Sequence, residues 1–254
     1  TNQCGCSLWA AQNERKMDMK HRKMVAMLLC CLFALGNAGV ALAYDPVASI
    51  APDGDAAYEI CAYTAQPDIR IAYPCFVGND ALNALVDAEV QSLVPEDTTG
   101  VTIDYNCAVT LLNSRFASMV FWGYSDVEGA AHPYTDIATL NVDLTEMRQV
   151  TLGDLYTVND EFEQTFFGKA SFPSEPVTSY SAEDFSNAME MEMADCQMYN
   201  PFSVEEGVIC FLKPDGLVLS MPAVHASGSD HFEAQLAYGD VQSFYLLSQN
   251  VWED

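Results

Sequence analysis

Basic residues are scarce in this chain, which has 10 Lys and Arg against 36 Asp and Glu in 254 residues. The formal net charge is −26. Recognition of nucleic acid or of anionic lipid needs Lys and Arg side chains, so the composition argues against both kinds of partner. A surface of one sign attracts partners of the opposite sign, although strong negative charge also serves solubility alone. The charge therefore favours either a basic partner or a role in solubility.

The sequence also lacks the common catalytic motifs. It has no Gly-x-Ser-x-Gly elbow, no His-Glu-x-x-His pattern and no phosphate-binding loop. His225 and His231 with Asp230 would make only a weak zinc site, because His-x5-His on a loop is an unspecific spacing. We predict no catalytic residue, no metal and no cofactor. Paired carboxylates, which wall hydrolases use, remain an alternative because acids are abundant.

An export signal is the clearest feature of the N-terminal region. Four basic-type residues at 20–23 precede an apolar stretch at 24–35, and Ala41-Leu42-Ala43 follows. This order is typical of a signal peptide and predicts cleavage between Ala43 and Tyr44. We expect residues 1–18 to be an upstream extension without native structure and 19–43 to be the signal peptide. If the signal is not cleaved, residues 24–43 are long enough to anchor the protein in a membrane.

The rest of the chain is predicted to be a flexible lead-in at 44–56 and a single domain at 57–254. Its two halves cover about 57–165 and 178–250. Five of the ten basic residues and 34 of the 36 acids lie after residue 43, which leaves a net charge of −29 there. The protein is expected to be secreted or to act in the cell envelope.

Five cysteines follow residue 43, so at least one thiol has no partner within the chain. Exported proteins can keep disulfides. Proximity in sequence favours the pairs Cys61–Cys75 and Cys196–Cys210. Cys107 lies on the apolar face of a predicted strand and is the candidate for the free thiol. Buried free thiols throughout are the alternative.

Strand patterns dominate the first half of the domain. Residues 57–64 and 69–73 flank Gln66-Pro67-Asp68 and predict a hairpin. Asn79 is placed to cap a helix whose apolar residues repeat at helical spacing until Pro95. Long alternating segments then predict a meander of antiparallel strands with one buried face, at 101–111, 116–124 and 135–144.

The second half contains a second helix and more strands. Thr151 with Asp154 and Ser181 with Asp184 have the spacing of capping boxes. Residues 157–178 are predicted to be a connector. A hairpin around 213–216, a strand at 232–238 and a closing segment at 241–247 complete an α+β fold. Its sheet is expected to be largely antiparallel, with long strands and two main helices packed on one side.

Several motifs resemble one known family. They are Phe121-Trp122-Gly123-Tyr124, Gly129-Ala130-Ala131-His132-Pro133, Leu140-Asn141-Val142-Asp143-Leu144 and Val150-Thr151-Leu152-Gly153-Asp154-Leu155-Tyr156, with the later Lys213-Pro214-Asp215-Gly216-Leu217 hairpin. In order and spacing they are similar to the extracytoplasmic domain of RsiV-type anti-sigma factors. The same module precedes some peptidoglycan deacetylase domains and occurs alone in secreted bacterial proteins. The resemblance covers about residues 57–250.

The resemblance implies binding rather than catalysis, because RsiV-type domains capture lysozyme, a basic protein. We predict a secreted or envelope binding module for a lysozyme-like protein or cell-wall glycan. The expected binding residues are Trp122, Tyr124, His132 and Pro133. A membrane-anchored sensor is the alternative if the signal stays uncleaved, although at most 23 residues precede the apolar stretch and leave little room for a sigma-binding segment. A cell-wall hydrolase with paired carboxylates is the second alternative.

Overall fold

The computed structural model describes residues 58–172, 181–194, 199–204, 208–223 and 230–247. These residues belong to one compact unit of the chain. The predicted upstream extension, signal peptide, Ala43–Tyr44 cleavage site and lead-in lie outside the described residues, as do Cys196 and His225. Within the described residues, no helix combines the length and the apolar character needed to cross a bilayer.

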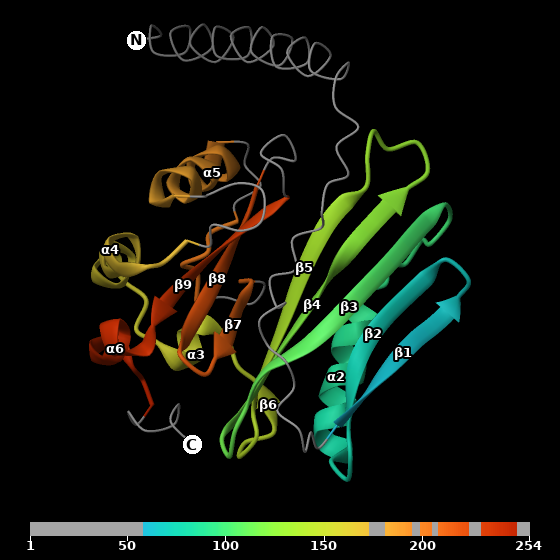
Figure 1. The fold of residues 1–254 in the computed structure, drawn as a ribbon, viewed down its shortest axis with the longest axis horizontal. Helices are drawn as coiled ribbons and strands as arrows, with labels where there is room; N and C mark the ends of the chain where they lie inside the picture. The colour runs from blue at the N-terminus through green and yellow to red at the C-terminus, as the bar shows by residue number, and fades with distance from the viewer. Residues whose placement is uncertain (1–57, 173–180, 195–198, 205–207, 224–229, 248–254) are drawn as a thin grey trace, which may run out of the picture. The chain divides into compact units, whose positions relative to one another are not determined.

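A six-stranded sheet forms the first half (Figure 1). Its strands follow one another in chain order: β1 (Tyr58–Gln66), β2 (Ile69–Phe76), β3 (Val101–Leu112), β4 (Phe116–Val127), β5 (Tyr134–Asp143) and β6 (Arg148–Gln149). The predicted hairpin at β1–β2 and the long strands β3 to β5 are confirmed. The α+β class is confirmed as well.

The antiparallel meander predicted for β3 to β5 is confirmed. The β2–β3 pair, which that prediction did not cover, is parallel. Helix α2 (Asp80–Ser92) lies between the two strands in sequence and returns the chain to the end at which β2 began. Asn79 caps this helix as predicted, because its side chain accepts a hydrogen bond from the Leu82 N–H at 3.1 Å. Leu82, Val86 and Val90 are buried against the sheet.

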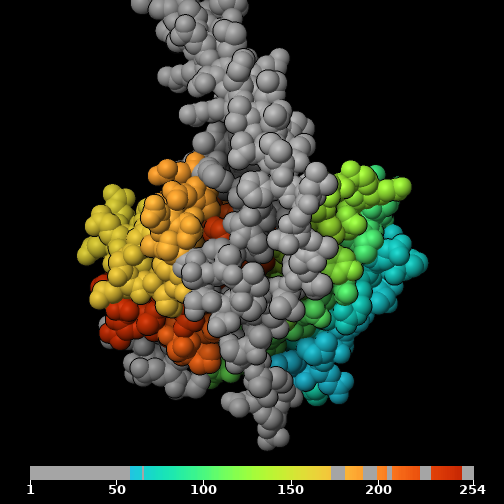
Figure 2. Space-filling model, turned by 45° about the horizontal axis from the view of Figure 1, so that its top comes forward, coloured from blue at the N-terminus to red at the C-terminus, as the bar shows by residue number. Residues whose placement is uncertain are grey.

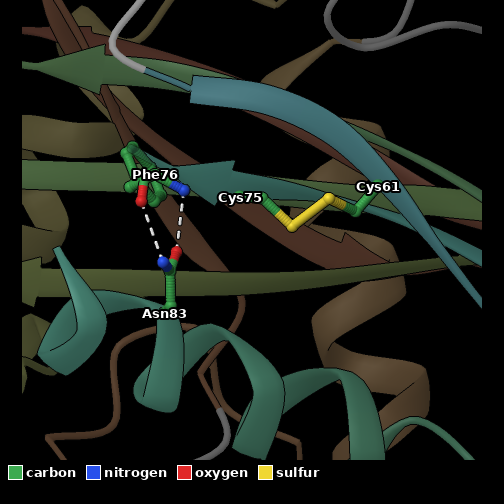
Figure 3. The surroundings of a disulfide bond; sticks show 4 residues. All are labelled: Cys61, Cys75, Phe76 and Asn83. Atoms are coloured by element: carbon green, nitrogen blue, oxygen red, sulfur yellow. Dashed lines mark hydrogen bonds between the residues drawn. A yellow bond between two sulfur atoms is a disulfide. The ribbon is translucent and has the colours of Figure 1, made fainter. Parts of the chain in front are cut away.

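Two side-chain links secure β2 (Figure 3). The predicted disulfide Cys61–Cys75 joins β1 to β2. On the helix side, the Asn83 amide bonds both backbone groups of Phe76, at 2.7 and 2.8 Å. Cys107 is a free thiol, as predicted, and burial raises its pKa to about 12.

A three-stranded antiparallel sheet forms the second half, with β7 (Cys210–Lys213), β8 (Gly216–Pro222) and β9 (His231–Ala237). Both predicted capping boxes are present, and they begin α3 (Leu152–Leu155) and α5 (Ala182–Ala194). The chain ends in α6 (Tyr238–Val241) and the 3-10 turn η2 (Gln242–Phe244). In the space-filling view, the yellow-to-red second half and the cyan-to-green first half occupy opposite flanks (Figure 2).

Helix α4 (Asp160–Lys169) corrects the prediction of a connector at 157–178. Asn159 caps it by accepting a hydrogen bond from the Phe162 N–H at 2.9 Å. Phe162 and Phe166 are fully buried and contact other aromatic rings at centroid distances of 5.1 to 6.4 Å. The second core is richer in aromatic residues than the first, with 8 of its 21 buried residues against 3 of 14.

A buried polar network joins the two sheets. The Ser118 hydroxyl donates to the Asn141 side chain at 2.7 Å and accepts from the Leu212 N–H at 2.9 Å. The Asn141 amide donates to the Cys210 carbonyl at 2.9 Å. The strand β7 thus covers the second face of β4 and β5, and residues 116–121 and 140–143 are buried on both faces. This corrects the prediction that only one face of these strands is buried.

Cys210 is a free thiol in this network, so the predicted Cys196–Cys210 disulfide is not formed. Its side chain is 2% exposed and its sulfur lies 3.7 Å from the Asn141 amide nitrogen. Burial raises the pKa of this thiol to about 12, which keeps it protonated and unreactive at neutral pH. Cys210 acts as a small core residue.

Candidate binding cleft

A cavity of about 490 Å³ opens where the two sheets separate, and we call it the cleft. One wall is the start of β5 with the residues before it, His132 and 134–137. The other wall comes from the second sheet: Ile209, Pro222, Ala223, Asp230 and His231. A smaller cavity of about 140 Å³ shares Thr135, Asp136 and His231 with the cleft, so the two adjoin.

The cleft exists because β4 and β5 extend beyond the cover of β7. Gly123 marks this transition on β4, where it pairs with Tyr105 of β3. A Cβ atom at this position would lie 2.0 Å from the Asp104 carbonyl oxygen. No side chain fits at that distance, so glycine is required for the close approach of β3 and β4. The glycine of the Phe121–Tyr124 motif therefore has a packing role.

Asp230 and Thr135 close one side of the cleft. The Asp230 carboxylate accepts the Thr135 N–H at 2.7 Å and the Thr135 hydroxyl at 2.8 Å. The Asp230 N–H donates to the Thr135 hydroxyl oxygen at 3.2 Å. These bonds join β5 to the start of β9 across 95 residues of sequence, so they fix the width of the cleft at this point.

Asp136 lies at the boundary of the two cavities. Its Oδ2 accepts the Tyr105 hydroxyl at 2.7 Å and the Ser125 hydroxyl. Burial, followed by the charge of Asp136, raises the pKa of Tyr105, so this phenol stays protonated and keeps donating. The carboxylate of Asp136 is therefore oriented beside the cleft by two neutral donors.

His231 and Glu233 form a buried pair behind the cleft, with exposed fractions of 5% and 4%. The His231 Nδ1 lies 2.5 Å from Glu233 Oε1, and the Ser220 hydroxyl donates to the same oxygen at 3.0 Å. Burial by itself lowers the pKa of His231, but the charges of Glu233, Asp230 and Asp136 outweigh it, so the pKa is raised. The His231 imidazole thus faces three carboxylates, which favour its protonated form.

Three of the four predicted binding residues line these cavities. Trp122 and Tyr124 line the smaller cavity, and His132 lines the cleft. The His132 ring lies 5.3 Å from the Tyr134 ring. Pro133 is exposed and lines neither cavity. Their role in binding remains a prediction.

The sequence patterns do not identify Asp136, Asp230 and Glu233, the partner of His231, as a site. The sequence suggests Asp230 and His231 only as weak zinc ligands. Among the described residues, no group of three His, Cys, Asp or Glu side chains could hold a metal ion. One local signal for the His231–Glu233 pair is present in the sequence. Glu233 follows His231 by two residues on one strand, and alternate residues of a strand share a face.

The lining chemistry suits a cation. No Lys or Arg lines either cavity within the described part of the chain. Arg115 and Arg148 form ion pairs with Asp143 and Glu146, which line neither cavity. Arg70 pairs with Asp104, which lines the smaller cavity, so its charge is matched there by a carboxylate. Carboxylates beside aromatic rings attract ammonium and guanidinium groups by charge and by cation–π contact.

Two solved structures are similar to this chain. One is a DUF3298 family protein from Pseudomonas aeruginosa PAO1, with 14% identity, a TM-score of 0.47 and coverage of 76% of this chain and 94% of that chain. The other is a member of the DUF3298 family from Bacteroides fragilis, with 13% identity, a TM-score of 0.44 and coverage of 78% and 96%. No family model matches the chain, and no curated protein does.

Proposed function

We propose that this protein is an extracytoplasmic binding module for a basic protein and that it performs no catalysis itself. The observation that carries this proposal is the cleft with Asp136 and Asp230 on its walls and no Lys or Arg among its described lining residues. The chain around it has a net charge of −26. Charge of one sign at a cleft and over the whole chain raises the encounter rate with an oppositely charged partner.

The location outside the cytoplasm is supported by the Cys61–Cys75 disulfide. Structural disulfides persist in oxidising compartments and are rare where cellular thiols keep cysteines reduced. The pattern at 20–43 supports the same location, because it resembles an export signal.

Lysozyme is the partner that we propose to test first. It is a basic protein of the cell exterior, and the RsiV-like motifs point to it. Two of these motifs supply Trp122, Tyr124 and His132, which line the cavities. Cell-wall glycan offers no positive charge to match the acids, so a basic protein fits the cleft better.

The absence of catalysis is part of the proposal, and the geometry of Ser220 supports it. A serine nucleophile needs a neighbouring base that takes its proton, and its hydroxyl must be accessible to a substrate. Here the Ser220 hydroxyl donates to Glu233 Oε1, the same atom that His231 contacts. All three residues are at most 5% exposed, so they form a structural network rather than a nucleophile with its base.

A binding experiment tests the proposal. The purified protein is immobilised, and lysozyme is passed over it at low ionic strength and then at increasing salt concentration. We expect saturable binding that weakens steeply with salt, because surface charge attraction is screened over about 8 to 10 Å at physiological salt.

Two controls make the result specific. A second basic protein of similar size and charge should bind at least tenfold more weakly than lysozyme, which corresponds to about 1.4 kcal/mol. Equal binding of both would contradict a lysozyme-specific role. No binding of any basic protein at low salt would contradict the proposed function as a whole.

A further inference from the structure

We propose that the cleft is a socket for one basic side chain, Lys or Arg, that projects from the partner protein. This inference rests on the proposed function and names the group that the site recognises. It follows from the way apolar, aromatic and charged groups are distributed over the walls of the cavity.

The first step concerns the shape of the ligand. Ile137, Ile209 and Pro222 supply apolar surface, whereas Asp136 and Asp230 supply charge. A Lys or Arg side chain has the matching division, because an apolar stem carries a charged head group. A bare metal ion has no stem, and a cavity of about 490 Å³ far exceeds the size of an ion.

The second step concerns the acceptor atoms. Both hydroxyl donors of Asp136, from Tyr105 and Ser125, bond its Oδ2. Its Oδ1 accepts no hydrogen bond from any described residue, and Asp136 itself is only half-buried. An oriented carboxylate with one available oxygen accepts an N–H donor from a cation, which gives a charge-assisted hydrogen bond.

The third step concerns the opening of the cleft. Tyr134 is 49% exposed, and its ring is paired with the His132 ring at a centroid distance of 5.3 Å. A cation that passes an aromatic face on its way to the carboxylates gains cation–π attraction. The ring pair restricts the ring orientation before binding, so little conformational entropy is lost when the ligand enters.

The fourth step concerns the sign of the charge. An anionic ligand would meet Asp136 and Asp230 on the walls and Glu233 behind them, and among the described lining residues only His132 and His231 can carry positive charge. These five groups sum to a net negative charge even when both histidines are protonated. An amino-acid cation is therefore the ligand class that satisfies the size, the apolar wall and the charge together.

Small model compounds test the socket directly. The probes are the Nα-acetyl methylamides of lysine, arginine and norleucine, titrated into the purified protein and followed by isothermal calorimetry or NMR. Norleucine has nearly the same stem as lysine but no charge. We expect saturable binding of the lysine or the arginine probe and at least tenfold weaker binding of norleucine. Equal response to all three probes, or no saturable response, would overturn the proposal.

Matched variants locate the binding. D136N and D230N each remove one charge but keep an oxygen that can accept the existing hydrogen bonds. D87N removes the same charge from an exposed position on α2, which lines neither cavity. We expect D136N and D230N to weaken binding of the cationic probe about tenfold and D87N to change it less than twofold. Equal effects of the three variants would overturn the proposal. Thermal melting of each variant confirms that it is folded.

The socket and the proposed function can fail separately. If lysozyme binds and D136N binds it as tightly as the native protein, the partner uses another surface and the socket is wrong. If no basic protein binds but the lysine probe binds at Asp136, the proposed function is wrong while the socket stands. If lysozyme binds and D136N weakens that binding, acetylation of the lysine amines of lysozyme shows whether the site takes Lys or Arg.

Discussion

The two ends of the β4–β5 hairpin differ in what covers them. At one end, residues 116–121 and 140–143 are buried on both faces, because β7 lies against the side that faces away from α2. At the other end, residues 122–127 and 134–138 are half-buried or exposed and border the cleft. One continuous pair of strands thus supports a core at one end and a cavity at the other.

The polar residues at the two ends also differ, because the network at the buried end is neutral and Asp136 at the open end is acidic. Ser118 and Asn141 at the buried end are neutral, and their hydrogen bonds run between the sheets. Asp136 at the open end is charged and has an oxygen that no described residue bonds. Neutral polar groups with complete hydrogen bonding stabilise a buried junction, whereas charge beside a cavity is suited to a ligand. Four predictions test this division.

The largest effect is expected at the buried end, in N141L. Leucine is close to asparagine in size, but it leaves the Cys210 carbonyl and the Ser118 hydroxyl without their partner. Buried polar groups without hydrogen bonds cost about 1–3 kcal/mol each, so the free energy of unfolding should fall by about 3 kcal/mol. Urea denaturation measures this change. A loss below about 1 kcal/mol would show that the network does not hold the sheets together.

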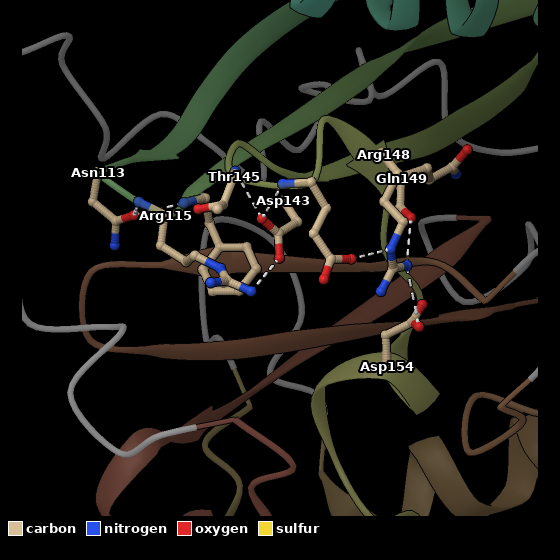
Figure 4. Close-up of polar contacts among 9 residues, drawn as sticks. Asn113, Arg115, Asp143, Thr145, Arg148, Gln149 and Asp154 are labelled. Atoms are coloured by element: carbon tan, nitrogen blue, oxygen red, sulfur yellow. Dashed lines mark hydrogen bonds and ion pairs between the residues drawn. The ribbon is translucent and has the colours of Figure 1, made fainter.

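A smaller loss is expected for D143N, at the turn that follows β5 (Figure 4). Asp143 is 2% exposed, and one carboxylate oxygen pairs with Arg115 at 2.5 Å while the other accepts the Thr145 and Glu146 N–H groups. Asparagine can keep the turn bonds but loses the ion pair. We expect the free energy of unfolding, measured by urea denaturation, to fall by about 2 kcal/mol. The loss of this ion pair costs less than the loss of a fully buried one, because Arg115 is partly solvated.

E146Q is the control for this ion pair. Glu146 pairs with Arg148 at 2.6 Å, but both side chains are about half exposed. Exposed pairs contribute little, so E146Q should cost less than about 0.5 kcal/mol. Similar losses for D143N and E146Q would mean that burial does not separate the two pairs.

A pH dependence is expected at the open end. The pKa of His231 in the folded protein is raised above its ordinary value near 6.5. Its contribution to stability is therefore complete below that value and is lost as pH rises through the raised pKa. The free energy of unfolding of the native protein should decline across this window, and H231Q and E233Q should lack that part of the decline. Parallel pH profiles for the native protein and H231Q would show that the pair does not contribute.

The smallest change in stability is expected for D136N. Asparagine keeps an acceptor for the Tyr105 and Ser125 hydroxyls, and the loss of one negative charge relieves repulsion in a chain of net charge −26. The free energy of unfolding should stay within about 0.5 kcal/mol of the native value. A loss of about 2 kcal/mol would place Asp136 with the structural residues of the buried end and not with the cleft.

The elements with local signals were predicted from the sequence. Asn79 caps α2, and alternation identifies β3, β4 and β5, because these signals depend on neighbours along the chain. Helix α4 also has local signals: Asn159 at its start, three acids in its first turn and Lys169 in its last. The nearby Pro173 and Pro176 favoured a connector instead. The aromatic packing of Phe162 and Phe166 that stabilises α4 involves residues far away in sequence.

Pairings between distant segments were not predictable in the same way. The parallel β2–β3 register and the contact of β7 with β4 and β5 depend on which surfaces meet after the elements have formed. The residues of the candidate site also fall into those that local motifs indicate and those that only the fold brings together. Trp122 and His132 were singled out by their motifs, but Asp230 reaches Thr135 only through folding of a chain segment 95 residues away.

The Cys61–Cys75 bond has a consequence for aggregation. β1 is the outermost strand of its sheet, and it pairs with β2 alone among the described strands. Closing a loop across 14 residues contributes on the order of 3 kcal/mol by restricting the unfolded chain. If a reductant opens this loop, β1 can detach and expose the edge of β2, a template on which other chains can pair. Long-term solubility would then depend on the redox state of the surroundings. The geometry of the acidic cleft would not, because the cleft involves neither β1 nor β2.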